Sequence, residues 1–338
     1  MKSNYLLLRS IPRVAGLALL RITLGGPIVS AQEPAAAPRP AEAGTRRALL
    51  ICGLPGDDEH RTMYAAATET IARALVERCG FAPGDVWVRF GVETTEGDGA
   101  ALKGSRGLAN RENITADAEA LRQLATPEDV VWIITLGHGH FDGRRSHLNL
   151  PGPDLSDQAF ARLFEGIKAK EQVFILTTSA SGFFLKPLAK PGRVAISATE
   201  ADQEVNETLY PLALAEVLNT PPPGADRDKD GVLSVFELYL AVAADVARRY
   251  VEDELIATEH AQLDDNGDGR GSEVQLTFPP LESGSEEPRP EEKPKDKAKV
   301  AAKPPAKAAP QLGPKDDGFV ASKVRVCQVA GLKPPEVR

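Results

Sequence analysis

Two apolar runs of the sequence end in short polar segments whose side chains could carry out acyl chemistry. Residues 130–136 run into Gly137-His138-Gly139, and residues 173–176 run into a Thr-Thr-Ser-Ala-Ser-Gly segment that contains Ser179. In an open α/β sheet, ligands bind outside the carboxyl ends of the strands. If both runs are parallel strands, His138 and Ser179 share one rim, where an imidazole could serve as general base for a serine hydroxyl.

Other side chains compete for these roles. His140 and His147 lie close to His138 in the sequence, but His138 directly follows the apolar run between two glycines, so we expect it to be the base. Asp142 is the nearest carboxylate that could orient the imidazole. The alternative is purely structural, in which Ser179 begins a tight turn and His138 has its hydrogen bonds satisfied.

Residues 226–237 match the EF-hand calcium loop at its diagnostic positions. Calcium takes six to eight oxygen ligands, and a bidentate glutamate closes such a loop. Gly231 stands at the sharp turn, and the oxygen donors are Asp226, Asp228, Asp230, the Val232 carbonyl, Ser234 through a water, and Glu237. Because closely spaced aspartates repel one another without a cation, we expect Ca²⁺ to be a cofactor.

The flanks of this loop indicate half of an EF-hand. Ser234 and Glu237 also form an S-x-x-E capping box, which opens a helix that we expect to reach about residue 263. Residues 220–224 (Thr-Pro-Pro-Pro-Gly) exclude a normal entering helix, because proline has no backbone N–H to donate.

A second acidic loop, residues 264–275, matches the motif less well. Gln275 replaces the bidentate carboxylate, so the segment is either a weak calcium site or an Asn/Asp/Gly turn. A straight helix of about 28 residues between the loops would separate them by about 42 Å, too far for both to bind one ion.

Length and charge limit the class of protein. The chain has 338 residues, of which 42% are hydrophobic, and a net charge of -8. This length permits one or two domains with a sizeable core. The lysines and arginines are scattered rather than clustered, which argues against nucleic acid as a partner.

The three cysteines do not indicate a disulfide framework. Cys52 ends the first strand and Cys79 lies at the far end of the helix that follows, which is more than about 20 Å away. Cys327 falls in low-complexity sequence, where we expect it to be exposed. Cys52 ends the first apolar run and competes with Ser179 as nucleophile, although cysteine in such a run usually packs in the core.

Composition divides the chain into segments. Residues 1–31 combine basic residues, an apolar stretch and a Val-Ser-Ala end, the pattern of a cleaved signal peptide, so we expect a secreted or periplasmic protein. Residues 32–44 form an Ala/Pro linker, residues 45–220 hold the main domain, residues 221–278 form an EF-hand-like extension packed on it, and residues 279–338 form a disordered Pro/Lys/Glu/Ala-rich tail. No other run approaches the roughly 20 apolar residues of a membrane span.

Within the main domain, short apolar runs alternate with amphipathic stretches. We expect strands at 48–52, 86–90, 130–136, 173–178 and 193–197, a hairpin near 147–150, and helices at about 61–78, 115–124 and 157–169. Such continuously apolar strands are covered on both faces. The sequence therefore predicts an α/β fold, with a mostly parallel sheet flanked by helices on both faces and a C-terminal helical extension.

This pattern resembles the caspase and legumain superfamily of cysteine peptidases over residues 46–220. The matching elements are the strand followed by His-Gly and the strand followed by a Thr-Ser-x-Ser-Gly turn, and bacterial legumain-like proteins are most similar. The resemblance implies a caspase-like three-layer sandwich, a peptide or protein substrate, and His138 as general base or acid. It also implies the nucleophile position at Ser179, with the backbone N–H groups of Gly139 and Ser179 as oxyanion donors.

The chain departs from the superfamily at the nucleophile, where serine replaces cysteine. A thiol with a pKa of about 8.5 is partly ionised at neutral pH, whereas a hydroxyl needs a well-oriented base. Two functions therefore stay open: a peptidase, hence a hydrolase, that uses Ser179 and His138, or an inactive relative that binds peptide or acts as a calcium-stabilised scaffold. The resemblance also places Arg61 and residues 198–204 near the substrate pocket, without fixing a specificity.

Overall fold

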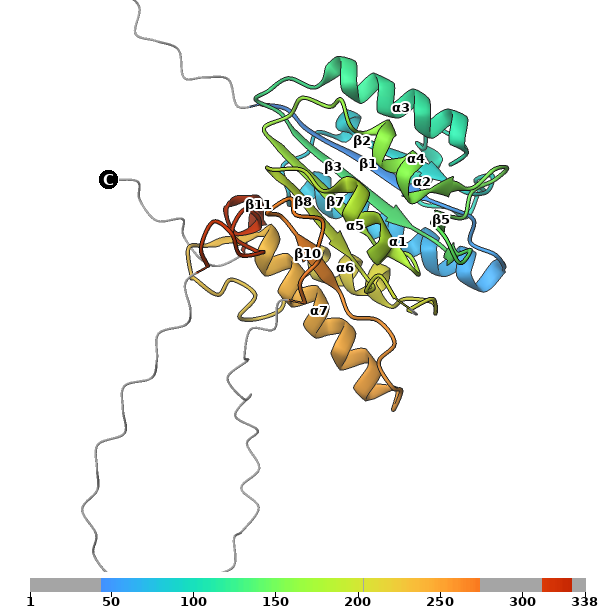
Figure 1. The fold of residues 1–338 in the computed structure, drawn as a ribbon. Helices are drawn as coiled ribbons and strands as arrows, with labels where there is room; N and C mark the ends of the chain where they lie inside the picture. Colours follow the sequence, from blue (N-terminus) through green and yellow to red (C-terminus); the bar gives the residue numbers. More distant parts are fainter. Residues whose placement is uncertain (1–43, 203, 274–311, 330–338) are drawn as a thin grey trace, which may run out of the picture. The chain divides into compact units, whose positions relative to one another are not determined.

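The computed structural model describes residues 44–202, 204–273 and 312–329, and a six-stranded sheet forms its centre (Figure 1). The strands are β1 (Arg46–Cys52), β2 (Val86–Phe90), β3 (Val130–Leu136), β7 (Glu171–Leu176), β8 (Arg193–Ser197) and β10 (Gln262–Asp264). Their order across the sheet is β10-β8-β7-β3-β1-β2. Only β10 is antiparallel to its neighbour. The predicted mostly parallel sheet is therefore confirmed.

Helices cover both faces of this sheet. One core includes α1 (Asp58–Glu77), α6 (Tyr210–Asn219) and α7 (Val235–Glu252), and the other includes α3 (Arg111–Leu124), α4 (Asp157–Leu163) and α5 (Leu185–Leu188). Leu50 of β1 belongs to the first core, and Leu49 and Ile51 belong to the second, because successive strand residues point to opposite faces. In Figure 1, α3 and α7 lie on opposite sides of the sheet. The fold is a three-layer α/β arrangement.

The strand order changes direction at β1. The chain passes from β1 through α1 to β2 on one side, and then returns through α3 on the other face to place β3 on the opposite side of β1. Such a change of direction opens a crevice between the carboxyl ends of the two central strands, and ligands of open α/β sheets bind there. The carboxyl ends of β1 and β3 are paired at Cys52 and Leu136, so this crevice is level with both.

Smaller elements surround the main sheet. A three-stranded sheet contains β4 (Gly139–Phe141), β5 (Ser146–Leu148) and β6 (Leu155–Ser156), and a two-stranded sheet contains β9 (Val232–Ser234) and β11 (Arg325–Gln328). The short helices are η1 (Pro83–Asp85), α2 (Ala100–Lys103), η2 (Ser181–Phe184) and η3 (Ala321–Lys323). Among the described residues, no helix has both the length and the apolar character needed to cross a membrane.

Side-chain caps fix where the longer helices begin. Asp57 accepts a hydrogen bond from the His60 backbone N–H at the start of α1, and Asn110 accepts one from Asn113 at the start of α3. Ser234 and Glu237 form the predicted capping box at the start of α7. These caps satisfy amide groups that have no partner within the helix.

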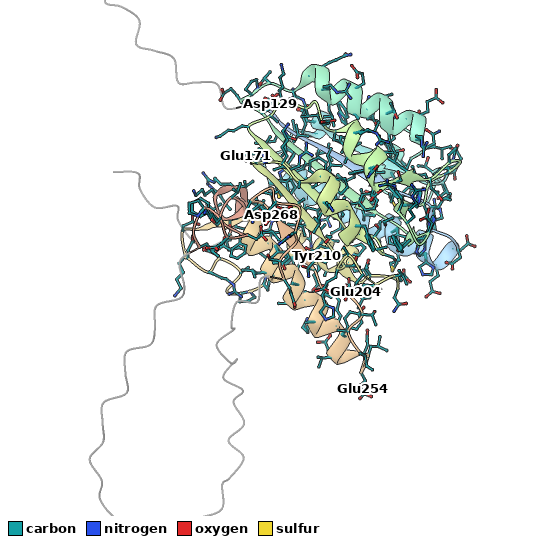
Figure 2. All side chains as sticks on the ribbon, viewed as in Figure 1. Asp129, Glu171, Glu204, Tyr210, Glu254 and Asp268 are labelled. Carbon is teal, nitrogen blue, oxygen red and sulfur yellow. The ribbon has the colours of Figure 1, made fainter. Side chains whose placement is uncertain are left out.

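The amino ends of the central strands lie together at the opposite edge of the sheet. Figure 2 shows Asp129 and Glu171 side by side, just before β3 and at the start of β7, and Val130 pairs with Glu171. The Asp129 carboxylate accepts hydrogen bonds from the Thr45 backbone N–H and the Arg47 guanidinium. This contact ties the entry of β1 to the entry of β3, in the register in which Arg46 pairs with Val130.

The structure corrects the expected ends of two helices and adds a strand. The helix that begins at residue 235 ends at Glu252 rather than near residue 263, because Glu254 takes a positive φ of 54° and turns the chain back. Residues 262–264 then join the main sheet as β10, antiparallel to β8. The helix expected at 157–169 ends at Leu163.

The prediction of a disordered tail is wrong for residues 312–329. Residues 274–311 and 330–338, which include the rest of that tail, lie outside the described residues. The expected signal peptide and residues 32–43 of the linker lie outside them as well. β11 pairs with β9, and Val326 and Cys327 are buried. The alternating run Val-Arg-Val-Cys is a strand pattern that the surrounding composition hid. Cys327, which we expected to be exposed, is buried beside Cys79, with which it shares a hydrogen bond.

Glu259 is a buried carboxyl group that caps α6. It is 5% exposed, and its Oε1 accepts a hydrogen bond of 2.6 Å from the Leu209 backbone N–H. Burial raises its pKa from 4.5 to about 7. The folded protein therefore holds a proton that the unfolded chain releases at lower pH, so the free energy of unfolding decreases as pH rises through this window.

We expect Glu259→Gln to reduce this pH dependence, because glutamine keeps the Oε1 acceptor and has no ionisable proton. Urea unfolding between about pH 5 and about pH 8 should show that the variant loses up to about 3 kcal/mol less stability than the native protein. Glu254→Gln, at an exposed position, is the matched control and should keep the native slope. Equal slopes for Glu259→Gln and the native protein would contradict the assignment.

Candidate functional site

His138 lies at the carboxyl end of β3, over the crevice between β3 and β1. Its Nε2 is 2.9 Å from the Pro55 carbonyl oxygen in the loop after β1, and a carbonyl only accepts, so this nitrogen donates. The ring packs edge-on against two residues of α1, with centroid distances of 5.1 Å to His60 and 5.5 Å to Tyr64. The imidazole is therefore held toward β1 and α1.

Ser179 follows β7, on the other side of β3, and is 4% exposed. The backbones of Gly139 and Ser179 touch, since a Cβ atom at position 139 would lie 2.6 Å from the Ser179 carbonyl oxygen. Ala180 has a φ of 54°, and η2 begins at the next residue. Ser179 thus opens a tight turn, as the structural alternative requires.

The structure brings His138, Gly139 and Ser179 to one rim without joining the imidazole to the hydroxyl. Within the part of the chain that the structure describes, no hydrogen bond links Ser179 to His138, and the His138 ring bonds to Pro55. The roles of these residues stay a prediction, while the shared rim agrees with the sequence analysis.

The neighbouring histidines occupy a separate cluster on the β4–β5 hairpin. His140 and His147 stack with ring centroids 4.9 Å apart. His140 Nδ1 is 2.6 Å from Asn149 Oδ1, and His147 Nε2 is 3.0 Å from Asp142 Oδ2. Asp142 therefore orients His147 rather than His138, so the expected carboxylate partner of His138 is corrected.

Cys52 is excluded as a competing nucleophile by its surroundings. It is fully buried in the core, and burial raises the pKa of its thiol to about 12. A thiol with such a pKa carries almost no thiolate at neutral pH.

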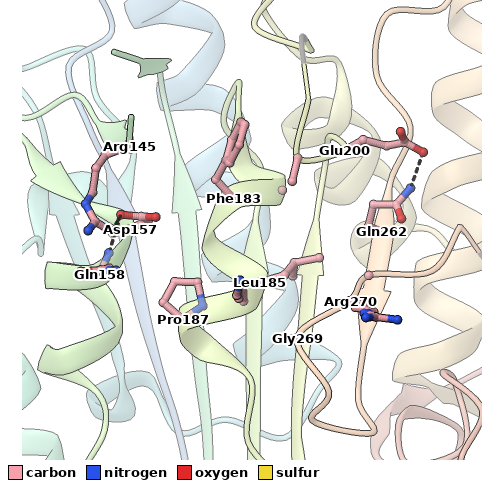
Figure 3. Close-up of a pocket in the computed structure, with 14 residues that line it drawn as sticks. Arg145, Asp157, Gln158, Phe183, Leu185, Pro187, Glu200, Gln262, Gly269 and Arg270 are labelled. Carbon is pink, nitrogen blue, oxygen red and sulfur yellow. Dashed lines mark hydrogen bonds and ion pairs between the residues drawn. The ribbon is translucent and has the colours of Figure 1, made fainter. Parts of the chain in front are cut away.

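An open pocket of about 750 Å³ lies beside η2, the short helix that follows Ser179 (Figure 3). Phe183 and Leu185 provide apolar walls, and Arg145, Glu200 and Arg270 add charged groups. The expectation that residues 198–204 line a pocket fits Glu200, whose Oε1 accepts a hydrogen bond from Gln262. Neither His138 nor Ser179 lines this pocket, and Arg61 is tied to the Asp98 carboxylate elsewhere.

The sequence analysis missed two residues that gather around His138. His60 Nε2 is 2.9 Å from Glu207 Oε2, and one ligand atom from each of His60, His138 and Glu207 lies within 4.8 Å of the others. Hydrogen bonds to the carboxylates of Asp57 and then Glu207 raise the pKa of His60. The position of His60 after the first strand could have indicated that it lies on the same rim as His138. Glu207 has no motif around it that could have identified it.

The acidic loop at residues 226–237 gathers carboxylates around a buried, unpaired oxygen. Oxygens of Asp226, Asp228 and Glu237 lie within 4.8 Å of one another, and Asp226 Oδ1 has no hydrogen-bond partner although Asp226 is only 7% exposed. Burial and then the charges of Glu237, Asp230 and Asp226 raise the pKa of Asp228. Gly231 has a φ of 83° at the sharp turn. This donor set fits a cation that prefers oxygen ligands.

The remaining predicted ligands of this loop have local roles as well. Ser234 Oγ donates to Glu237 Oε2 within the capping box, and Asp230 Oδ1 accepts a hydrogen bond from the Val232 backbone N–H. Glu237 Oε1 also accepts a hydrogen bond of 2.7 Å from the Arg227 backbone N–H, so its two oxygens face the loop.

The second acidic loop contrasts with the first. Asp264 Oδ1 and Oδ2 accept hydrogen bonds of 2.9 Å from the backbone N–H groups of Gly267 and Gly269. Both oxygens are thus satisfied without a cation, as in an Asn/Asp/Gly turn. Gln275 lies outside the described residues.

Comparison of the chain with models of protein families and with curated proteins finds no match.

We expect Gly139→Ala to destabilise the protein, because the added Cβ would meet the Ser179 carbonyl oxygen at 2.6 Å and the His147 carbonyl oxygen at 3.0 Å. Thermal and urea unfolding should show a loss of about 1–3 kcal/mol, typical of overpacking. The control is Gly84→Ala, where a Cβ would meet nothing within 4 Å. Equal losses for the two variants would show that the backbones at 139 and 179 are not in contact.

Proposed function

We propose that this chain is a calcium-binding relative of the caspase and legumain peptidases that binds peptide in the pocket beside η2 without cutting it. The observation that carries this proposal is the hydrogen bond from His138 Nε2 to the Pro55 carbonyl oxygen. A serine hydroxyl needs a base within hydrogen-bonding distance to become a nucleophile, and His138 is engaged on the β1 side of the rim instead.

Relationship to the superfamily is supported by the order of elements around the rim. A His-Gly pair follows β3 and a Ser-x-Ser-Gly turn follows the adjacent strand β7, as the resemblance implies for a caspase-like sandwich. In this proposal the EF-hand-like extension covers residues 221–278, of which the structure describes 221–273. The signal-like pattern of residues 1–31 supports export to the periplasm or the medium.

Peptide binding is supported by the pocket beside η2. Phe183 stacks on Phe141 with ring centroids 4.3 Å apart, which fixes an apolar wall, and Arg145 and Glu200 offer charges of both signs. A pocket that combines apolar walls with a few polar groups suits a side chain of an extended peptide.

Calcium binding is supported by the unpaired Asp226 Oδ1. A buried carboxylate oxygen without a hydrogen bond costs free energy that a bound cation would remove. Asp226, Asp228 and Glu237 converge from both ends of the loop, so an ion at this position would join the α6–α7 connection to the start of α7.

The first test asks whether Ser179 reacts. We expect a serine-directed phosphonate to leave the native protein unlabelled, and Ser179→Cys to gain no cleavage of a peptide library, because the His138 ring is hydrogen-bonded to Pro55 and not to residue 179. Peptides selected from the library should bind native protein and Ser179→Ala with equal affinity, and Phe183→Ala should weaken their binding by about tenfold, because it removes an aromatic wall of the pocket. Labelling that disappears in Ser179→Ala would show that Ser179 is a reactive nucleophile and would refute the proposal that the protein binds peptide without cutting it.

The second test measures calcium by its effect on the melting temperature. A ligand that binds only the folded state at a hundredfold excess over its Kd stabilises it by about 2.7 kcal/mol, so we expect a rise of about 5 °C or more. Glu237→Gln should cancel this rise, because glutamine retains the capping box but lacks the bidentate carboxylate.

The matched control for this test is Glu252→Gln, an exposed glutamate at the end of the same helix, which should keep the response to calcium. Native protein that melts at the same temperature in calcium and in a chelator would rule out the site.

A further inference from the structure

We propose that His60, His138 and Glu207 bind a divalent transition metal of the Zn²⁺ class in the crevice between β1 and β3. One ligand atom from each residue lies within 4.8 Å of the others, and His60 Nε2 is 2.9 Å from Glu207 Oε2. Ligands about 2.1 Å from a tetrahedral zinc ion are about 3.4 Å from one another, so the cluster needs only small side-chain adjustments to accept it.

Each of the three ligands already has an outer partner that orients it. Asp57 Oδ1 is 2.7 Å from His60 Nδ1, and the Tyr64 hydroxyl donates to Glu207 Oε1 at 3.2 Å. The Pro55 carbonyl holds Nε2 of His138 protonated, so the other ring nitrogen of His138 carries the lone pair. A carboxylate or carbonyl behind each metal-binding histidine is the usual arrangement in metal sites.

The cluster lies where the fold forms a ligand site. His138 follows β3, and His60 stands in the first turn of α1, the helix that follows β1. Both therefore belong to segments that follow the two strands between which the strand order changes direction. Ligands of open α/β sheets bind at this crevice. The side chains of His60 and Glu207 are 27% and 39% exposed, so an ion can reach them from solvent.

The donor types select the metal. Two imidazoles and one carboxylate suit zinc and neighbouring transition metals, whereas calcium and magnesium prefer oxygen ligands alone. Three protein ligands leave a fourth position for water or another ligand. The site is thus chemically distinct from the acidic loop at residues 226–237, and it does not depend on whether Ser179 reacts or whether that loop binds calcium.

The test is calorimetric titration of Zn²⁺ into the full chain, first treated with a chelator and then kept in saturating Ca²⁺ so that oxygen-only sites are filled. We expect one Zn²⁺ per chain, and Co²⁺ in its place should give the visible absorption of a four-coordinate site. Glu207→Gln, which keeps the acceptor for Tyr64, and His60→Gln should each reduce the affinity by at least about tenfold.

Two controls locate the ion. His147→Gln alters the separate histidine pair on the hairpin, and Glu237→Gln alters the acidic loop, and both should bind Zn²⁺ as the native protein does. Melting curves in chelator verify that each variant is folded. No binding by the native protein, or equal binding by the native protein and Glu207→Gln, would overturn the proposal. His60 would then only form hydrogen bonds with the carboxylates of Asp57 and Glu207.

Discussion

The parallel pairing of β3 with β1 on one side and β7 on the other is the constraint on which the rest of the structure depends. β3 is buried along its whole length, and it pairs in register from Val130 to Leu136. Because the three strands end at one level, the segments after them emerge on a common rim, which carries Pro55, His138 and Ser179. The backbone hydrogen bonds between the strands therefore determine which side chains lie close enough to interact.

Much of this frame could be predicted from the sequence, because it follows from local pattern. The strands at 86–90, 130–136 and 193–197 have the predicted limits, since each is an apolar run bounded by polar residues. β10 could not be predicted, because three residues give no periodicity and its pairing with β8 is a long-range contact. The end of α7 was missed for a related reason, as no glycine or proline marks the turn at Glu254.

For the site, the order of elements along the chain could predict which residues share a rim, but not how their side chains point. Chain order places His138 and Ser179 on the same rim, but the direction of the His138 ring depends on Pro55 and His60, which lie about eighty residues earlier. Glu207 joins the cluster from a loop without a motif, 147 positions after His60. Asp142 was the nearest carboxylate in sequence, yet the hairpin turns it toward His147. Side-chain direction is thus a tertiary property that spacing does not encode.

The two acidic loops show why composition alone does not define an ion site. In both loops the first aspartate accepts a hydrogen bond from the glycine amide five positions later, at Gly231 and at Gly269. The difference is the second oxygen, which is paired in Asp264 and unpaired in Asp226. A sequence motif identifies the candidate ion sites. A buried carboxylate oxygen without a hydrogen bond distinguishes the loop that fits a cation from the loop that does not need one.

The strand β9 belongs to the acidic loop and is also the partner of β11. Asp265 strengthens this attachment, because its carboxylate accepts hydrogen bonds from the backbone N–H groups of Gly318 and Ala321. The described residues on either side of positions 274–311 consequently belong to one folded body. A single break there would not release the carboxyl-terminal piece, and the molecule would persist as two fragments held together without a covalent bond.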